Sequence, residues 1–372
     1  MIGASKLPKS TAISGAMSRL EAVLATDKLM LTVFNPGHRL HHGIELKDGA
    51  LTPSFESPSR ADMVLAQVQA SVLGAVIAPA EHERSSYVKA HSERYVRFLE
   101  TAWTAWADTG RKHDALPLVW PVRGLRDDIE PFSIDGKLGF YAMDAGAPIA
   151  AATWGAVKGS ANVALTGMDA LAAGARGVFA LCRPPGHHAA RETMGGYCYL
   201  NNAAIAAQRC IDGGAKRVAV LDVDFHHGNG TQDIFYERSD VLFVSLHGEP
   251  AVSYPFFSGH ADEQGAGAGL GFNLNFPLPQ GTAWDAYGAA LAQACQRIRS
   301  YGPDTLVVSL GVDTFKDDPI SHFKLESVDF ARIGVAIAAL GVPSLFVMEG
   351  GYMVEEIGIN AVNVLLGFEG RQ

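Results

Sequence analysis

The segment at residues 218–230, VAVLDVDFHHGNG, constrains this chain more than any other part of its sequence. Its apolar residues are typical of a strand that is buried on both faces of a parallel sheet. Asp224 and His226 interrupt the run, and both are costly to bury without a partner. Because alternate residues of an extended strand point the same way, the two side chains can ligate one cation. The alternative is structural, with aspartates that cap a turn and histidines that are hydrogen-bonded in the core.

Composition limits the class of protein. A chain of 372 residues with 48% apolar content can form one large α/β domain or two smaller ones. The formal charge of −9 argues against a broad nucleic-acid-binding face and leaves cationic small molecules or basic peptides as ligands. The cysteines form no CxxC pair, so we expect reduced thiols in a cytoplasmic protein. They are Cys182, Cys198, Cys210 and Cys295.

The first 28 residues differ in charge from the rest of the chain. They carry +2, so the remainder carries −11. They lack the apolar core of a signal peptide, and no window of the sequence approaches the roughly 18 uncharged apolar residues of a membrane span. We predict a flexible extension over 1–28, with a short helix at 17–25, followed by a domain over 29–372 that makes no membrane contact.

The first half of that domain holds a strand candidate at 30–34 and helix candidates at 59–73 and 86–106. Ser59 is the expected cap of the first helix. The second helix carries an aromatic face that we expect to be core: Tyr95, Phe98, Trp103 and Trp106. Three histidines follow the strand, and with no acidic partner nearby we predict a loop packed near a pocket mouth rather than a metal site. They are His38, His41 and His42.

Beyond residue 153 the chain alternates strand-like and helix-like segments. This pattern predicts an open, mostly parallel sheet flanked by helices, in a single α/β domain. The strand candidates are 177–182, 217–224, 241–247, 271–276, 305–312 and 344–348, and the helix candidates are 200–212, 284–299, 328–340 and 357–366. Residues 116–150 break this rhythm and are too long for an ordinary connection, so either a functional or interfacial loop or a solvated one is expected.

Polar groups follow four of the strand candidates. In open parallel sheets, ligands bind outside the carboxyl ends of the strands. Two aspartates and one histidine would give a divalent metal three ligands and leave a position open for catalysis. A histidine pair supplies candidate bases, and a tyrosine after Gly-Gly can donate to an oxyanion. Taken alone, a pair of adjacent histidines is often a hydrogen-bonded pair in the core, and a Gly-Gly-Tyr sequence is often only a turn. The residues are His187, His188, Asp224, His226, Asp313 and Tyr352.

The motifs RPPGHHA, GGYCYLNN, LDVDFHHGNGTQDIFY, VSLHG, SLGVDTFKDDP and MEGGY occur in this order from about residue 30 onward. Together they resemble the metal-dependent deacetylases, which include histone deacetylases and bacterial acetylpolyamine amidohydrolases. FHHGNGTQDIFYER and GVDTFKDDPIS are most similar to the polyamine branch. The resemblance implies an arginase/deacetylase-like fold, so we expect 29–372 to be a deacetylase domain with 116–150 as an insertion loop.

The resemblance also implies a role for each polar group. Zn²⁺ would be held by Asp224, His226 and Asp313. His188 would be the general base and acid, His187 would act mainly electrostatically, and Tyr352 would polarise the acetyl carbonyl. Asp222 would orient His187 and Asn229 would orient His188. Some members carry aspartate at the second of these positions, and an amide supports an imidazole less strongly.

Further binding residues come from the same resemblance. A structural K⁺ would lie near Asp222, Asp224, His226, Ser245 and Leu246. Tyr197 and Phe257 would form the walls of the acyl tunnel beside Gly196, or they are ordinary core aromatics. The 116–150 loop resembles the insertion by which acetylpolyamine amidohydrolases form homodimers and narrow the tunnel. Within it, Asp135 would lie near a distal ammonium, or it is an exposed loop carboxylate.

The predicted function is zinc-dependent hydrolysis of acetyl groups from N-acetylated polyamines or diamines. The first alternative is a deacetylase of acetyl-lysine in proteins or peptides, which would use the same chemistry. The second is a non-catalytic acyl-amine-binding protein. Because the metal-ligand, histidine and tyrosine positions are all filled, the sequence favours an enzyme, with a small acetylated amine rather than nucleic acid or membrane as its partner.

Overall fold

A sheet of eight strands organises the protein, for which a computed structural model describes residues 29–47 and 49–371. The strand order is β4-β1-β5-β10-β9-β6-β7-β8, and every pairing within it is parallel. The strands are β1 (Leu31–Phe34), β4 (Val76–Ile77), β5 (Gly177–Leu181), β6 (Val218–Asp222), β7 (Val241–Gly248), β8 (Asn273–Leu278), β9 (Thr305–Leu310) and β10 (Ser344–Met348). The predicted open parallel sheet is confirmed, and all seven predicted strands belong to it.

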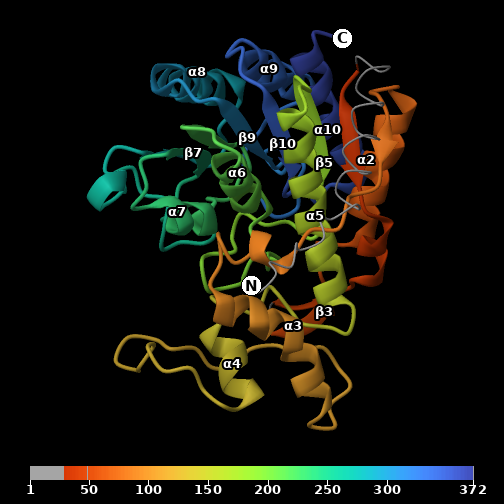
Figure 1. The fold of residues 1–372 in the computed structure, drawn as a ribbon. Helices are drawn as coiled ribbons and strands as arrows, with labels where there is room; N and C mark the ends of the chain where they lie inside the picture. The colour runs from red at the N-terminus through yellow and green to blue at the C-terminus, as the bar shows by residue number, and fades with distance from the viewer. Residues whose placement is uncertain (1–28, 48, 372) are drawn as a thin grey trace, which may run out of the picture.

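Helices cover both faces of the sheet (Figure 1). They are α2 (Pro58–Ala70), α3 (Glu93–Ala107), α4 (Ile134–Phe140), α5 (Thr153–Ala172), α6 (Asn202–Asp212), α7 (Asn229–Phe235), α8 (Trp284–Tyr301), α9 (Ser327–Ala338) and α10 (Val354–Glu369). Val218 and Val220 of β6 pack into one apolar cluster with α3, α5 and α6. Ala219 and Leu221 pack into the other with α2, α8, α9 and α10. Alternate residues therefore feed two cores, as a doubly covered strand requires.

The largest element that the sequence pattern did not predict is α5. This helix is buried along most of its length, so it lacks the polar face that marks an amphipathic helix. The hairpin β2 (Ile44–Lys47) and β3 (Ala50–Pro53), the two-residue β4 and the seven-residue α4 and α7 were also missed, because each is too short to show a period.

The predicted helix cap at Ser59 was wrong. Helix α2 begins at Pro58, and Ser57 occupies the N-cap position. The fixed φ of proline suits the first turn of a helix, which explains the earlier start. The aromatic face of α3 is core as predicted, because Tyr95, Phe98 and Trp106 are buried.

The 116–150 segment contains α4 and extends from the body of the protein. Figure 1 shows α4 and the loops beside it at the lower end of the molecule, away from α8 and α9. Several apolar side chains of this segment are exposed, with Leu118 at 84% and Phe132 at 102% of full exposure. The predicted extension at 1–28 and its helix at 17–25 lie outside the described residues.

Candidate active site

Three potential metal ligands meet at the carboxyl ends of two neighbouring strands. Asp224 and His226 follow β6, and Asp313 follows β9, which pairs with β6. Their ligand atoms lie within 4.8 Å of one another, and all three residues are buried. His226 Nδ1 is 3.2 Å from Asp224 Oδ1 and 3.0 Å from Asp313 Oδ2. The strand-end pattern therefore brings the three donors together as expected, while their binding of a metal stays a prediction.

The charges of this cluster depend on one another. Burial alone would lower the pKa of His226, but hydrogen bonds to Asp224 and Asp313 outweigh it and raise the pKa to about 10. Burial would raise the pKa of Asp224, but the positive charge of His187 and the hydrogen bond from His226 hold it well below its usual range. Burial and the charge of Asp224 raise the pKa of Asp313 to about 7. Metal binding would therefore compete with protonation of His226 and Asp313.

Backbone contacts hold both carboxylates. The Gly350 N–H donates to Asp224 Oδ2 at 2.8 Å, and the Phe225 N–H donates to Asp313 Oδ1 at 2.8 Å. A Cβ added at Gly311 would lie 2.0 Å from Asp224 Oδ2, and one added at Gly350 would lie 2.5 Å from it. Glycine is required at both positions, because the chain must approach the carboxylates this closely.

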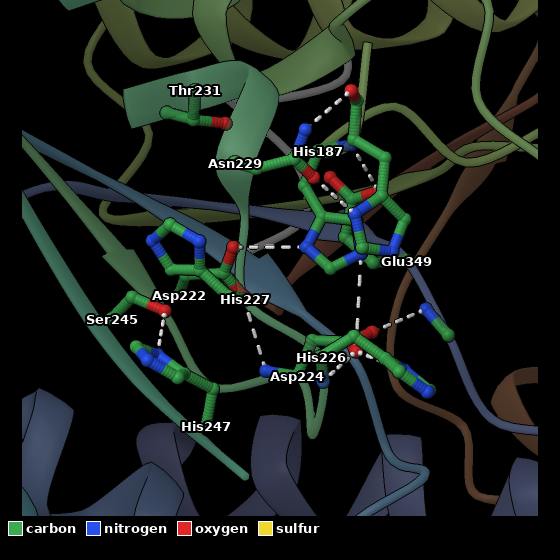
Figure 2. A network of polar contacts seen from close by, with 12 residues as sticks. His187, Asp222, Asp224, His226, His227, Asn229, Thr231, Ser245, His247 and Glu349 are labelled. Carbon is green, nitrogen blue, oxygen red and sulfur yellow. Dashed lines mark hydrogen bonds and ion pairs between the residues drawn. The ribbon is translucent and has the colours of Figure 1, made fainter. Parts of the chain in front are cut away.

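The tandem histidines occupy the loop after β5, with ring centroids 4.1 Å apart. Figure 2 shows the contact of His187 Nδ1 with Asp222 Oδ2, at 3.0 Å. Burial would lower the pKa of His187, but Asp224 and Asp222 raise it to about 10. Burial and the charge of His187 hold the pKa of His188 well below its usual range. The surroundings therefore favour the imidazolium form of His187 and the neutral form of His188.

Asn229 decides which nitrogen of His188 carries the proton. Its Oδ1 lies 2.7 Å from His188 Nδ1, while its Nδ2 donates to Met143 Sδ and to the His188 carbonyl. Because the amide oxygen faces the ring, Nδ1 of His188 is the donor, and Nε2 keeps a lone pair. The predicted orienting contacts, Asp222 to His187 and Asn229 to His188, are both present.

Tyr352 follows β10 and lines the same site. Its N–H donates to Asp318 Oδ2 at 2.8 Å, and the Arg60 guanidinium lies 4.8 Å from the ring centroid. Arg60 also donates to the carbonyls of Glu349 and Gly351, and these hydrogen bonds hold the backbone just before Tyr352. Burial raises the pKa of the phenol well above its usual value, so the hydroxyl stays protonated and can donate. The sequence pattern missed Arg60, because nothing distinguishes it from other helix residues.

The predicted potassium residues are buried beside this centre. Asp222 of β6 pairs in register with Ser245 of β7, and Leu246 follows. The Ser245 hydroxyl lies 2.8 Å from His247 Nδ1, a contact visible in Figure 2. This arrangement neither requires nor excludes potassium, so that site stays a prediction.

A cavity of about 340 Å³ is lined by residues of the metal-ligand cluster and the tandem histidines, and by Tyr352. His188, His226 and Tyr352 line the cavity, and these three residues together with His187, Asp224 and Asp313 are called the floor. The other lining residues are Glu45, Leu46, Asp144, Ala145, Gly146, Gly196, Tyr197, Tyr254 and Ile320. Gly196 and Tyr197 line it as predicted. Both have positive φ, +51° and +67°, which glycine adopts freely but which strains the backbone at Tyr197. Such strain often occurs at functional sites.

Two predicted substrate contacts lie outside this cavity. Phe257 is 89% exposed, and Tyr254 is the aromatic residue of that loop that packs against His188. Asp135 is half-exposed and pairs with Arg111 at 2.6 and 3.1 Å. Tyr254, not Phe257, lines this cavity, while a tunnel-wall role of Phe257 and a substrate contact of Asp135 both stay predictions.

The loop that holds His38, His41 and His42 packs against Arg183. His38 and His41 are buried, and their carbonyls accept hydrogen bonds from Arg183 at 2.7 and 2.9 Å. Among the described residues, neither belongs to a group of three or more side chains placed to hold a metal ion. Glu45 lines the cavity a few residues further on, which puts the loop near the mouth.

Comparison with known proteins identifies the family of this chain. Residues 54–367 match the family described as the histone deacetylase domain. The chain is 61% identical to acetylpolyamine amidohydrolase 2 of Pseudomonas aeruginosa, over 92% of this chain and 99% of that protein. It is 50% identical to the acetylpolyamine amidohydrolase of Mycoplana ramosa, over 92% and 100%. A crystal structure of the acetylpolyamine aminohydrolase of Burkholderia pseudomallei has a TM-score of 0.86 at 39% identity, covering 91% of this chain and 98% of that one. This chain therefore belongs to the histone deacetylase family.

Proposed function

We propose that this protein is a zinc-dependent amidohydrolase that removes acetyl groups from N-acetylated diamines and polyamines. One observation carries the proposal: a floor of potential metal ligands, a neutral histidine and a protonated phenol lies under a cavity whose walls include Glu45 and Asp144. The likeness to acetylpolyamine amidohydrolases over nearly the full length supports the same substrate class.

The donor set fits zinc. Asp224, His226 and Asp313 supply two carboxylates and one imidazole, which would leave one coordination position open. When bound there, the ion would polarise the acetyl carbonyl and favour ionisation of water. Iron or cobalt could bind to the same ligands, so the metal content of the purified protein must be measured. The proposed potassium near Asp222 and Ser245 would be structural.

The chain's own groups supply the proton transfers. Nε2 of His188 can take a proton from the attacking water and return it to the departing amine. Asp222 and Asp224 favour a cationic His187, which would stabilise the negative charge that develops on the acetyl oxygen. The Tyr352 hydroxyl can donate to that oxygen, as in an oxyanion hole.

The walls of the cavity favour a slender cation. Glu45 Oε2 accepts a hydrogen bond from the Tyr197 hydroxyl at 2.5 Å, so a carboxylate lies beside the aromatic wall. A methylene chain can pack on the rings, while its distal ammonium is attracted to the carboxylate. The negative charge of the whole chain would steer such cations toward the site.

We further infer that the 116–150 segment forms a homodimer. Several of its apolar side chains, including Leu118 and Phe132, are exposed, and exposed apolar side chains that form a patch often mark a protein interface. Sedimentation should give a dimer for the wild type and a monomer for the double variant Leu118→Ser, Phe132→Ser. A wild-type monomer at micromolar concentration would contradict the inference.

A cytoplasmic location is also part of the proposal. All four cysteines are free thiols. Within the described residues, no helix has the length and apolar character needed to span a bilayer.

A kinetic panel tests the function. Zinc-loaded protein is assayed with N-acetylputrescine, N-acetylcadaverine and acetylspermidine, and with an acetyl-lysine peptide, before and after chelation. We expect kcat/KM for the best small amine to exceed that for the peptide by about tenfold or more. Preference for the peptide would indicate a protein deacetylase. A metal-loaded protein that hydrolyses none of them would indicate a binding protein.

A further inference from the structure

Asp144 joins three segments that surround the cavity. Its Oδ2 accepts a hydrogen bond from the Tyr254 hydroxyl at 2.6 Å and one from the Gly196 N–H at 3.1 Å. Its Oδ1 accepts from the Gly146 N–H at 2.8 Å. One carboxylate at the end of the insertion thus holds the turn that carries Tyr197 and the loop that carries Tyr254.

Both segments lie directly against the predicted general base. The rings of Tyr254 and His188 are perpendicular, with centroids 5.0 Å apart. A Cβ added at Gly196 would lie 2.4 Å from His188 Cδ2 and 2.9 Å from the Tyr254 hydroxyl oxygen. The Tyr197 N–H also donates to the Gly146 carbonyl, at 3.2 Å. A small shift of Asp144 would therefore change the width of the tunnel beside the reacting groups.

The charge of Asp144 is not neutralised by these contacts. Its partners are a phenol and backbone N–H groups, which stabilise a carboxylate without cancelling its charge. The described residues that line the cavity include Glu45 and Asp144 but neither lysine nor arginine. Each tyrosine wall thus carries its own phenol–carboxylate pair, Tyr197 with Glu45 and Tyr254 with Asp144.

We propose that Asp144 is a positioning and specificity-determining residue, which fixes the Tyr254 wall and the Gly196 turn and whose charge selects acetylated amines that carry an ammonium. This inference rests on the proposed amidohydrolase function and assigns part of its substrate selectivity to one side chain. Electrostatic attraction to an ammonium is stronger in such a cavity than in bulk water, because the surroundings are less polar.

The charge is tested with two substrates of similar length. N-acetylputrescine is cationic, whereas N-pentylacetamide is neutral. Asp144→Asn keeps a side chain of the same shape and removes the charge. We expect the ratio of kcat/KM between the cationic and neutral substrates to fall about tenfold, the usual cost of losing a charge-assisted contact. Asp240→Asn is the control, because Asp240 pairs with Arg238 just before β7, at the opposite end of that strand from the site. An unchanged ratio in Asp144→Asn would overturn the proposal.

Positioning is tested with two further variants. Asp144→Ala removes the acceptor, so kcat should fall for both substrates, and Asp144→Asn should restore most of it. Tyr254→Phe keeps the aromatic ring at this position and leaves the Asp144 carboxylate in place. The ratio of kcat/KM between the cationic and neutral substrates should therefore match that of the wild type. An Asp144→Ala variant with wild-type kcat on both substrates would overturn the positioning role.

Dissociation constants separate this inference from the proposed function. Calorimetry measures the binding of both amides to the wild type and to Asp144→Asn without any need for turnover. A wild type that hydrolyses neither amide contradicts the proposed function. In that case, tenfold weaker binding of N-acetylputrescine alone in Asp144→Asn still supports the inference, and equal binding overturns it.

Discussion

The floor and the walls of the cavity are built in different ways. The floor groups lie within a few residues of strand ends: His187 after β5, Asp224 after β6, Asp313 after β9 and Tyr352 after β10. The sheet itself therefore sets their spacing. The walls come from the hairpin residue Glu45 and from loops that carry Asp144, Tyr197 and Tyr254.

This difference separates chemistry from selectivity. The floor is anchored by backbone N–H groups of adjacent strand ends, such as the Gly350 N–H that donates to Asp224. Because the backbone approaches the carboxylates so closely, the floor leaves little room for substitutions. The walls are joined to one another by side chains, such as Asp144 to Tyr254. Changes in the floor should abolish the reaction, whereas changes in the walls should mainly alter which amine is accepted.

The largest effect should follow removal of a floor ligand. Asp313→Ala leaves two donors, so bound zinc should fall from one per chain toward zero and kcat/KM should fall by roughly 10³-fold or more. Elemental analysis and steady-state kinetics measure both. Asp317→Ala, in the same loop but exposed, is the control and should retain zinc. Full zinc content and activity in Asp313→Ala would contradict the assigned ligand set.

Tyr352→Phe should preserve the metal and lose the oxyanion donor. The expected fall in kcat is roughly 10²–10³-fold, the typical effect of deleting one such donor. Zinc content and the KM for N-acetylputrescine should change little. Unchanged turnover would remove Tyr352 from the chemistry.

Asn229→Asp should shift the pH dependence of the reaction. A carboxylate beside Nδ1 of His188 favours the imidazolium, so the pKa of His188 rises and more of it is protonated at a given pH. The acidic limb of the kcat/KM profile should therefore move to higher pH, and Asn229→Ala should lower kcat by about 10–100-fold. An acidic limb that stays in place would mean that another group acts as the base.

The smallest effect is expected for substitutions in the wall of the cavity. Tyr254→Ala removes an aromatic surface from the cavity, so KM for small acetylated amines should rise about tenfold. Phe257→Ala should change KM by less than about threefold, because that ring is exposed outside the cavity. Equal effects at both positions would restore the original expectation for Phe257.

The sequence predicted the floor better than the walls for a physical reason. Apolar runs mark where strands end, and a parallel sheet brings those ends to one edge, so Asp224, His226 and Asp313 were expected to meet. The roles of His188 and Asn229 needed the family resemblance. Tyr254 and Asp144 lie in aperiodic loops whose packing depends on other loops, and no local pattern predicts such contacts.

The central claim is that one zinc ion binds between the strand ends of β6 and β9 in the active protein. Anomalous diffraction recorded above and below the zinc edge, from crystals of enzyme with measured turnover of N-acetylputrescine, tests it directly. We expect one strong zinc peak per chain within bonding distance of Asp224, His226 and Asp313. A fully active crystal with no zinc peak there, or with its only zinc elsewhere, would contradict the claim.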